Sequence, residues 1–315
     1  MPGVGPVDTH TLGVLSMRAF GADTPPSDYM IVGGTFRFRS VPGRHQTGVW
    51  IARGRAPTFS ATPTRAGSSV PRGTQWHDTR IIFNGTHPGC IERRLPRVLR
   101  GACEFDGRFS LTQKFNGRHF LYARQNPTEV GSRFVQYVTS EDTLSWSPFA
   151  PISIRDYRPS DGDVYFFAAQ VSRQPRGVQS AAPPPARVPT LFSAQVNPAD
   201  PSSLIALAPF VHHGCGCVGI VASRDGARWS RIFPLLHAET DLSGARSVSH
   251  PVAGLVRRGD TIVMYFHLHV WLSNAIADMK GLVKEHDPFP DRRVVAYTIP
   301  LETFGNWTRR MLDAV

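Results

Sequence analysis

Lysine and cysteine are scarce in this sequence of 315 residues, and it contains no long apolar run. Lysine occurs only at Lys114, Lys280 and Lys284, so almost all of the positive charge is arginine. No Lys/Arg-rich block or basic helix is visible, which argues against nucleic acid as a partner despite a formal net charge of +11. Dispersed arginine is typical of solvated surface charge, and a smaller anionic partner stays open.

No stretch of 18 apolar residues occurs, so no membrane-spanning helix is expected. The first residues, MPGVGPVDTH, lack the basic and apolar regions of a secretory signal, and none is predicted. Four cysteines are too few for a disulfide-dense scaffold, although Cys90 and Cys103 could form one bridge in an oxidising compartment. These features do not indicate which compartment the protein occupies.

The other two cysteines, Cys215 and Cys217, lie two positions apart in HHGCGCVGI, beside His212 and His213. Zinc sites usually contain cysteine pairs separated by two to four residues, with a second pair elsewhere in the chain. The shorter spacing here favours buried thiols without a metal, in or beside a strand. We therefore expect neither a metal nor a cofactor.

An internal repeat carries most of the fold prediction. Residues 131–146, GSRFVQYVTSEDTLSW, and 214–229, GCGCVGIVASRDGARW, both read as an apolar strand followed by Ser-x-Asp-x-x-x-Trp. The motif consists of Ser140, Asp142 and Trp146 in the first copy and of Ser223, Asp225 and Trp229 in the second. Residues 48–59 and 292–304 keep the strand without the full motif. In each of four units, two further apolar strands precede this one.

Turn residues support these strands, and glycine and proline, at 28 and 27 residues, favour many short strands joined by turns. Asn116-Gly117 predicts a hairpin between RFSLTQK and HFLYARQ, and Gly259-Asp260 predicts one between HPVAGLVRR and TIVMYFHLHV. The one predicted helix is SNAIADMKGLVKE, residues 273–285, which begins at an N-cap serine.

The units predict a single all-β domain over residues 1–315, folded as a five-bladed β-propeller of four-stranded antiparallel blades. The segment from Trp76 to Cys103 has one clear strand, fits none of the four units and is assigned to the fifth blade. The alternative is a β-sandwich made of similar hairpins. The units are longer than a four-stranded blade requires, and the excess is expected in long insertions near residues 54–74, 172–190 and 272–292.

The spacing Ser-x-Asp-x-x-x-Trp after an apolar strand resembles the blade motif of five-bladed propeller glycosidases, especially glycoside hydrolase families 43 and 32. The segment from Ser223 to Trp229 matches it well and is also similar to a shortened sialidase Asp box. The resemblance implies a propeller that acts on carbohydrate. In such a motif the aspartate holds the turn through backbone amides, so Asp142 and Asp225 are expected to be structural. The tryptophan is expected to pack between blades.

The resemblance also places catalytic carboxylates on the innermost strands of separate blades. Glycoside hydrolysis needs two carboxyl groups flanking the bond, one as acid and one as base or nucleophile. Glu104 is assigned as the general acid, because its Cys-Glu-Phe context predicts burial, which raises a carboxyl pKa. Asp78 is assigned as the base, and Asp106, on the same face of an extended strand as Glu104, is assigned as the helper. Asp106 could instead shape a turn with Gly107, and Asp78 could pair with Arg80.

Four positions near unit openings or second-strand ends are the expected substrate contacts, namely Arg80, Arg124, Asn126 and His250. Converging arginines would bind an acidic or sulfated sugar through paired hydrogen bonds, whereas arginines paired with Asp or Glu would not. Tyr265, His267 and His269 alternate along one predicted strand, as residues of a core, a pocket wall or a metal site do.

The sequence therefore predicts a glycosidase-like propeller that hydrolyses glycosidic bonds in a glycan, and an anionic glycan is the substrate if the arginines converge. It lacks the Trp-x-Asn-Asp-Pro-Asn-Gly opening of family 32, a clear Arg-Asp-Pro and the opening of the sialidases. These gaps leave a second hypothesis, in which the propeller binds a glycan or a protein and catalyses nothing.

Overall fold

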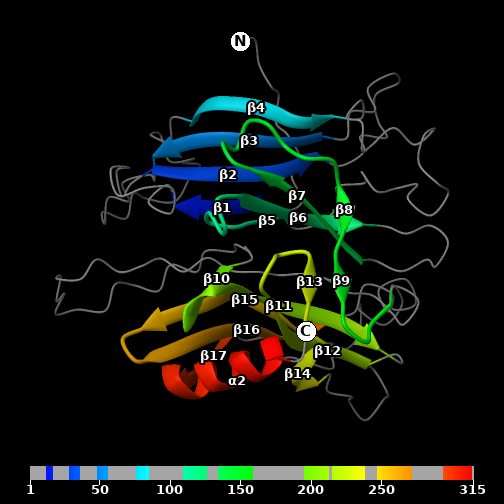
Figure 1. The fold of residues 1–315 in the computed structure, drawn as a ribbon, viewed down its shortest axis with the longest axis vertical. Coiled ribbons are helices and arrows are strands. Elements are labelled where there is room, and N and C mark those ends of the chain that lie inside the picture. The colour runs from blue at the N-terminus through cyan, green and yellow to red at the C-terminus, as the bar shows by residue number, and fades with distance from the viewer. Residues whose placement is uncertain are drawn as a thin grey trace, which may run out of the picture.

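The computed structural model describes residues 12–16, 28–35, 48–55, 76–84, 109–125, 134–158, 195–212, 215–237, 247–271 and 294–313. Within these ranges the protein consists of four antiparallel sheets, one two-stranded parallel pair and a single helix (Figure 1), which confirms the predicted all-β class. That helix is too short and too polar to cross a membrane. The expected helix at 273–285, the pair Cys90 and Cys103, and nearly all of the expected insertions lie outside the described residues.

The first sheet consists of four consecutive strands, each paired with the next. They are β1 (Leu12–Ser16), β2 (Asp28–Thr35), β3 (Gly48–Arg55) and β4 (Trp76–Asn84). The assignment of the segment from Trp76 to a fifth blade is therefore wrong, because β4 pairs along β3. A long connection before β4 costs little extra loop-closure entropy, so the chain can return to the sheet that it left.

The second sheet has the same order, and its first hairpin, between β5 and β6, is the predicted one. Its strands are β5 (Ser110–Leu111), β6 (His119–Gln125), β7 (Phe134–Ser140) and β8 (Ala150–Pro151). Asn116 and Gly117 connect β5 to β6 with φ angles of 50° and 80°. Two successive positive φ values are what a tight hairpin turn requires, and Asn-Gly supplies them at the lowest steric cost.

In the third and fourth sheets antiparallel strands again pair in chain order. The third contains β10 (Gln195–Asn197), β11 (Asp200–His212), β12 (Cys215–Ser223) and β14 (Phe233–His237), and the fourth contains β15 (Ser247–Arg258), β16 (Thr261–Trp271) and β17 (Val294–Pro300). Strand β10 leads the third sheet, whereas the sequence-predicted leading strand, DVYFFAAQV, lies outside the described residues. Gly259, at φ 59°, forms the predicted turn between β15 and β16.

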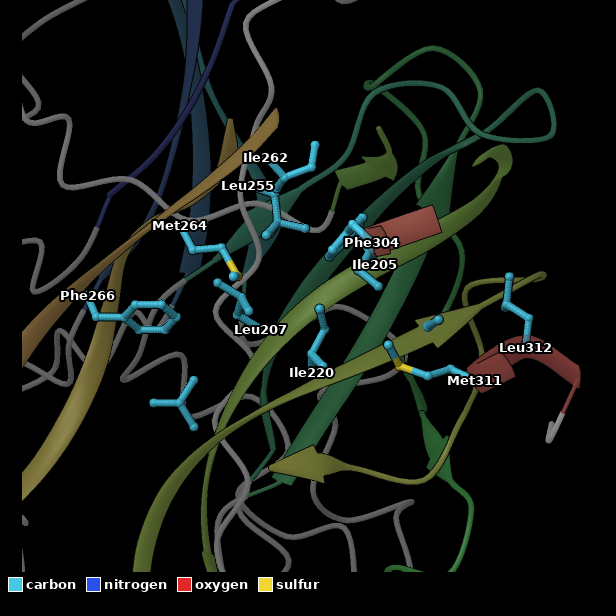
Figure 2. Close-up of a cluster of buried hydrophobic side chains, with 12 residues drawn as sticks. Ile205, Leu207, Ile220, Leu255, Ile262, Met264, Phe266, Phe304, Met311 and Leu312 are labelled. Atoms are coloured by element: carbon cyan, nitrogen blue, oxygen red, sulfur yellow. The ribbon is translucent and has the colours of Figure 1, made fainter. Parts of the chain in front are cut away.

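Two buried clusters join successive sheets. One contains Tyr122 and Phe134 of the second sheet together with Leu204 and Val221 of the third. The other lies between the third sheet, the fourth sheet and the C-terminal helix, as Figure 2 shows. Its members include Ile205, Leu207, Ile220, Leu255, Met264, Phe266, Phe304 and Met311. Alternate residues of β11 enter different clusters, so both faces of the third sheet are covered.

The last described element is helix α2 (Leu301–Asp313), which the sequence analysis did not predict. Glu302 in the first turn and Arg310 in the last turn have the charges that the helix dipole favours. The helix buries a stripe at helical spacing, consisting of Phe304, Thr308, Met311 and Leu312. Tertiary packing of this stripe stabilises a sequence in which Gly305 and Asn306 are weak helix formers.

A buried asparagine fixes the helix to the third sheet. The side-chain amide nitrogen of Asn197 donates to the hydroxyls of Ser203 and Thr308, both at 3.1 Å. Its carbonyl oxygen accepts the amide of Ala199 at 3.0 Å. Both the nitrogen and the oxygen of the Asn197 side chain thus have hydrogen-bond partners, so this buried contact orients α2 without the cost of an unsatisfied polar group.

Candidate functional site

The first Ser-x-Asp motif forms a tight turn after β7. The hydroxyl oxygen of Ser140 accepts a hydrogen bond from the amide of Thr143 at 2.8 Å. One carboxylate oxygen of Asp142 accepts the amides of Leu144 and Ser145 at 2.7 and 2.9 Å. These side chains satisfy backbone groups at the point where the chain leaves the sheet.

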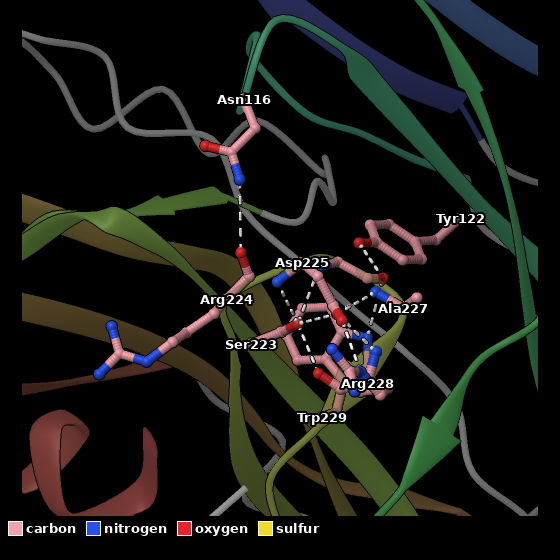
Figure 3. Close-up of polar contacts among 9 residues, drawn as sticks. Asn116, Tyr122, Ser223, Arg224, Asp225, Ala227, Arg228 and Trp229 are labelled. Carbon is pink, nitrogen blue, oxygen red and sulfur yellow. Dashed lines mark hydrogen bonds and ion pairs between the residues drawn. The ribbon is translucent and has the colours of Figure 1, made fainter. Parts of the chain in front are cut away.

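The second motif repeats this turn after β12 (Figure 3). Ser223 accepts the amide of Gly226 at 2.8 Å, and Asp225 accepts the amides of Ala227 and Arg228 at 2.9 and 2.8 Å. The donors stand at the same offsets from serine and aspartate as in the first turn. The repeat predicted from the sequence is therefore confirmed as a structural repeat.

The two aspartates have the structural role predicted for them. The amides of Ser145 and Leu144 hold the pKa of Asp142 below its usual value. Burial pushes the pKa of Asp225 upward, but the hydrogen bonds from Arg228 and Ala227 and the charge of Arg228 together lower it. Both carboxylates thus remain ionised acceptors for backbone amides at neutral pH.

The residue after each tryptophan also belongs to the motif, which the sequence analysis missed. The hydroxyl oxygen of Ser147 accepts the amide of Thr139 at 2.9 Å, and the amide of Ser147 donates to the carbonyl of Thr139 at 2.9 Å. Ser230 is bonded in the same way to Ala222, at 3.1 and 2.9 Å. Both copies continue Trp-Ser, so extending the aligned repeat by one residue would have found this contact.

The second turn joins the second sheet to the third. Trp229 is 1% exposed and packs edge-on against Tyr122, with 5.7 Å between ring centroids. The hydroxyl of Tyr122 donates to the carbonyl of Gly226 at 2.8 Å, as Figure 3 shows. Beside it, β13 (Arg228–Trp229) pairs in parallel with β9 (Ser153–Ile154), which follows the second sheet. This tryptophan therefore packs between two sheets, as the resemblance led us to expect.

The proposed catalytic carboxylates fall in different parts of the chain. Glu104 and Asp106 lie outside the described residues, shortly before β5. Asp78 lies in β4, at the opposite edge of the first sheet from β1, and the register of β3 and β4 shifts between Ile51 and Arg53 beside it. Its expected position at the opening of a fifth blade is wrong. Its catalytic role remains a prediction.

The expected substrate contacts are distributed over three sheets. Arg80 lies in β4 and Arg124 in β6, whereas Asn126 lies outside the described residues. His250 of β15 lies directly opposite His267 of β16 in the register. Directly opposed residues of antiparallel strands share a face, so the fourth sheet places two histidine positions together.

The face of β16 that carries Tyr265 and His267 is not the face of the main core. Met264 and Phe266 alternate with these residues and belong to the cluster that packs against α2. The hydroxyl of Tyr265 accepts a hydrogen bond from the guanidinium of Arg258 at 2.8 Å in an exposed contact. The core interpretation of this alternating set therefore does not apply to Tyr265.

A buried glutamine on a leading strand is a candidate ligand contact that the sequence did not reveal. Gln195 of β10 is 3% exposed, and its side-chain oxygen and nitrogen have no hydrogen-bond partner among the described residues. It lies directly opposite Ile205, on the face of the third sheet that packs toward the fourth. A buried amide without a partner costs stability, and natural proteins retain such costs mainly at functional positions.

Replacing Gln195 with methionine should raise the free energy of unfolding by about 1–2 kcal/mol, because the unpaired amide is removed at similar volume. The matched control is Gln136→Met. Gln136 is 2% exposed and, unlike Gln195, is not among the described buried side chains that lack a hydrogen-bond partner, so its replacement should lower stability by about 1–3 kcal/mol. Urea unfolding of both variants gives the comparison. A loss of stability in Gln195→Met would show that the amide is satisfied in solution.

Comparisons with known proteins give distant structural likenesses. No protein-family model matches the sequence, and no curated protein matches it significantly. A Hadza microbial sialidase is similar at 12% identity and a TM-score of 0.43, over 81% of this chain and 41% of that chain. An N-acetylgalactosamine deacetylase from F. plautii, in complex with blood group B trisaccharide, is similar at 11% identity and a TM-score of 0.45, over 96% and 74%.

A third similar structure is a beta-1,2-mannobiose phosphorylase from Listeria innocua in complex with beta-1,2-mannobiose. Its identity is 10% and its TM-score 0.44, over 93% of this chain and 59% of that chain. The chain therefore spans less than two thirds of the length of the sialidase and of the phosphorylase. At such identities and TM-scores, these likenesses identify neither a family nor a substrate.

Proposed function

We propose that the protein is a glycan-acting hydrolase built as a β-propeller. The observation that carries this proposal is the pair of matching Ser-x-Asp-x-x-x-Trp turns on two four-stranded antiparallel sheets. The second turn also buries its tryptophan against the preceding sheet. Both properties agree with the blade motif of the propeller glycosidases that the sequence resembles.

The packing of successive sheets limits how such a propeller would close. Strand β1 lies beside β5, the second and third sheets share one core, and the third and fourth share another. Each sheet thus packs on the next one in chain order. A fifth blade would therefore have to complete the ring between the fourth sheet and the first.

The proposed reaction uses Glu104 as the general acid and Asp78 as the base, with Asp106 as helper. Glu104 and Asp106 precede β5, which leads the second sheet. Asp106 follows Glu104 by two positions, about 6.7 Å along an extended strand, so a carboxylate there could tune the general acid. Asp78 contributes from a different sheet.

The proposed substrate is an acidic glycan. Arginine forks bind carboxylate or sulfate groups through two parallel hydrogen bonds, and the proposed contacts include two arginines. The full set of proposed contacts is Arg80, Arg124, Asn126, His250 and the buried Gln195. Burial of Gln195 without a partner supports its inclusion, because a sugar hydroxyl can both donate to and accept from an amide.

Glu104→Gln should lower the turnover of a hydrolysed aryl glycoside by at least about a hundredfold, because glutamine cannot protonate the leaving oxygen. The screen uses neutral, uronic and sialic aryl glycosides with the full chain. The matched control is Glu141→Gln, whose carboxylate is exposed and pairs with Arg118 at 3.5 Å on the surface. This control should keep the activity unchanged.

Two outcomes would contradict the proposal. Binding of oligosaccharides without any turnover would support the non-catalytic hypothesis instead. Equal activity of Glu104→Gln and Glu141→Gln would remove Glu104 from the mechanism. The pH profile adds a further check, since loss of the general acid should abolish the decrease in activity at high pH.

A further inference from the structure

The outer edge of the fourth sheet has no partner strand among the described residues. This sheet has the order β15-β16-β17, whereas each of the other three antiparallel sheets has a fourth strand beyond its third. In those sheets the fourth strand comes later in the chain than the third. In the fourth sheet, helix α2 begins directly after β17, as Figure 1 shows. The residues that follow β17 up to Asp313 thus form a helix in place of a fourth strand.

The backbone groups of β17 that face away from β16 follow from the register of the two strands. The amide of Leu301 donates to the carbonyl of Asp260 at 2.7 Å, which continues the antiparallel register of β16 and β17. Backbone groups alternate in direction along a strand, so the amides at even-numbered positions of β17 point outward. These are the amides of Val294, Ala296 and Thr298, and no described residue accepts a hydrogen bond from them.

This edge lacks most of the devices that keep sheet edges from pairing. Its sequence, VVAYTIP, contains no charged residue, and its register with β16 is free of bulges. Pro300, which has no amide hydrogen, blunts only the last position of the strand. Val294 is 48% exposed and Tyr297 is 42% exposed, so large apolar side chains border the free edge. An uncharged, exposed edge of this kind is expected to pair with another strand.

The outward backbone groups are complementary to those of a second copy of the same strand. In an antiparallel pair that crosses at Ala296, this residue lies opposite Ala296 of the second copy, and Val294 lies opposite Thr298. Every outward amide then has an outward carbonyl as its acceptor. A crossing one residue later would set Val294 opposite Pro300 and lose a hydrogen bond, because proline has no amide to donate.

The side chains agree with the same crossing. On the face that carries the core, Tyr297 would lie opposite Val295 of the second copy, and an aromatic opposite a β-branched residue is a favourable cross-strand pair. The ring of Tyr297 already packs edge-on against Phe266, with 5.7 Å between centroids. On the other face the β-branched residues Val294 and Thr298 would form a second pair. The strand thus supplies both halves of each pair, which favours a second copy over an unrelated peptide.

We propose that two copies of the chain associate through β17, with a two-fold axis at Ala296, so that their fourth sheets form one continuous sheet. Such an interface is isologous, because each copy contributes the same residues. A single pair of strands makes a small interface, and small interfaces are typical of reversible complexes. The dimer should therefore dissociate on dilution. This inference does not depend on the proposed hydrolase activity.

The test is sedimentation equilibrium of the full chain between about 1 µM and about 1 mM, the range in which weak complexes dissociate. We expect the mass to rise with concentration from 34.7 kDa toward twice that value. Ala296→Lys and Ala296→Asp should each weaken the dimer at least about tenfold, because the crossing sets like charges directly opposite each other. An equimolar mixture of the two variants should dimerise again. The control is Leu144→Lys, which changes a side chain that is 47% exposed in another sheet's turn and should leave the dimer intact.

Hydrogen exchange gives a second readout at the same concentrations. The amides of Val294, Ala296 and Thr298 should exchange rapidly in dilute protein and slowly in concentrated protein, whereas those of Val295 and Tyr297, which face β16, should be protected in both.

A monomer at every concentration would overturn the proposal, and would mean that the edge stays free or is covered by the chain's own residues. So would a dimer that Ala296→Lys leaves unchanged. Failure of the Lys and Asp variants to associate when mixed would overturn the crossing at Ala296. Each variant is first checked for cooperative urea unfolding, and Thr298→Lys, which would lie against Val294 of the second copy, replaces any that fails to fold.

Discussion

Replacing Trp229 with alanine should lower the free energy of unfolding by about 3–5 kcal/mol, whereas replacing Trp146 should cost far less. Trp229 is 1% exposed and lies in the core between the second and third sheets, while Trp146 is only half-buried. Both indole nitrogens donate to a carbonyl of their own turn at 3.2 Å. Both variants therefore lose the same hydrogen bond within the turn. The difference between their losses of unfolding free energy measures the contribution of packing between the sheets.

Urea unfolding followed by circular dichroism gives both values. Trp229→Phe provides a further comparison, since it keeps an aromatic ring in the core and loses the indole hydrogen bond, at a cost of about 1–2 kcal/mol. Similar losses in Trp229→Ala and Trp146→Ala would contradict the packing argument. They would mean that the turn itself, rather than its contact with the second sheet, sets the contribution of this residue.

The features that the sequence predicted correctly are local ones. The Asn116-Gly117 hairpin and the two Ser-x-Asp turns depend on residues a few positions apart, whose backbone preferences act in any surroundings. The structural role of Asp142 and Asp225 followed from the same local logic. Such features are recoverable because their hydrogen bonds close within one turn.

The features that were missed depend on contacts between distant segments. Strand β4 looked like an orphan because its partner β3 lies beyond a long connection. Helix α2 was missed because Gly305 and Asn306 lower its intrinsic helix propensity. Its apolar stripe stabilises the helix only by packing against the sheets, where Phe304 is buried, and this packing is not visible in the sequence. In both cases tertiary pairing decides the element.

The candidate sites show the same division. The sequence named His250 and His267 separately, and the register of β15 and β16 then placed them opposite each other. The sequence placed His212 near Cys215 and Cys217, whereas only strand pairing revealed that His237 lies opposite Cys217. Gln195 could not be identified at all, because an unpaired buried amide is a property of its surroundings and not of its neighbours in sequence.

Gly226→Ala should be among the most damaging small substitutions in the described part of the chain, with an expected loss of about 2–5 kcal/mol. Gly226 has a φ of 79°, where a side chain costs about 1–2 kcal/mol by itself. An added Cβ would also lie 2.5 Å from a ring carbon of Phe120. That ring cannot move away freely, because Phe115, Tyr122 and Tyr137 surround it with centroids 6.0–6.3 Å away.

The control that separates the two effects is Gly117→Ala. Gly117 has nearly the same φ, 80°, but nothing lies within 4 Å of the position of its Cβ. Its replacement should therefore cost only the backbone penalty of about 1–2 kcal/mol. Equal losses in the two variants, measured by urea unfolding, would show that Phe120 relaxes and that the second turn is less tightly held against the second sheet than its contacts indicate. The double variant Gly226→Ala with Phe120→Leu tests the contact directly. If it is less destabilised than the two single losses in unfolding free energy predict, the extra loss in Gly226→Ala comes from the clash with Phe120, because the smaller leucine leaves space for the new methyl group.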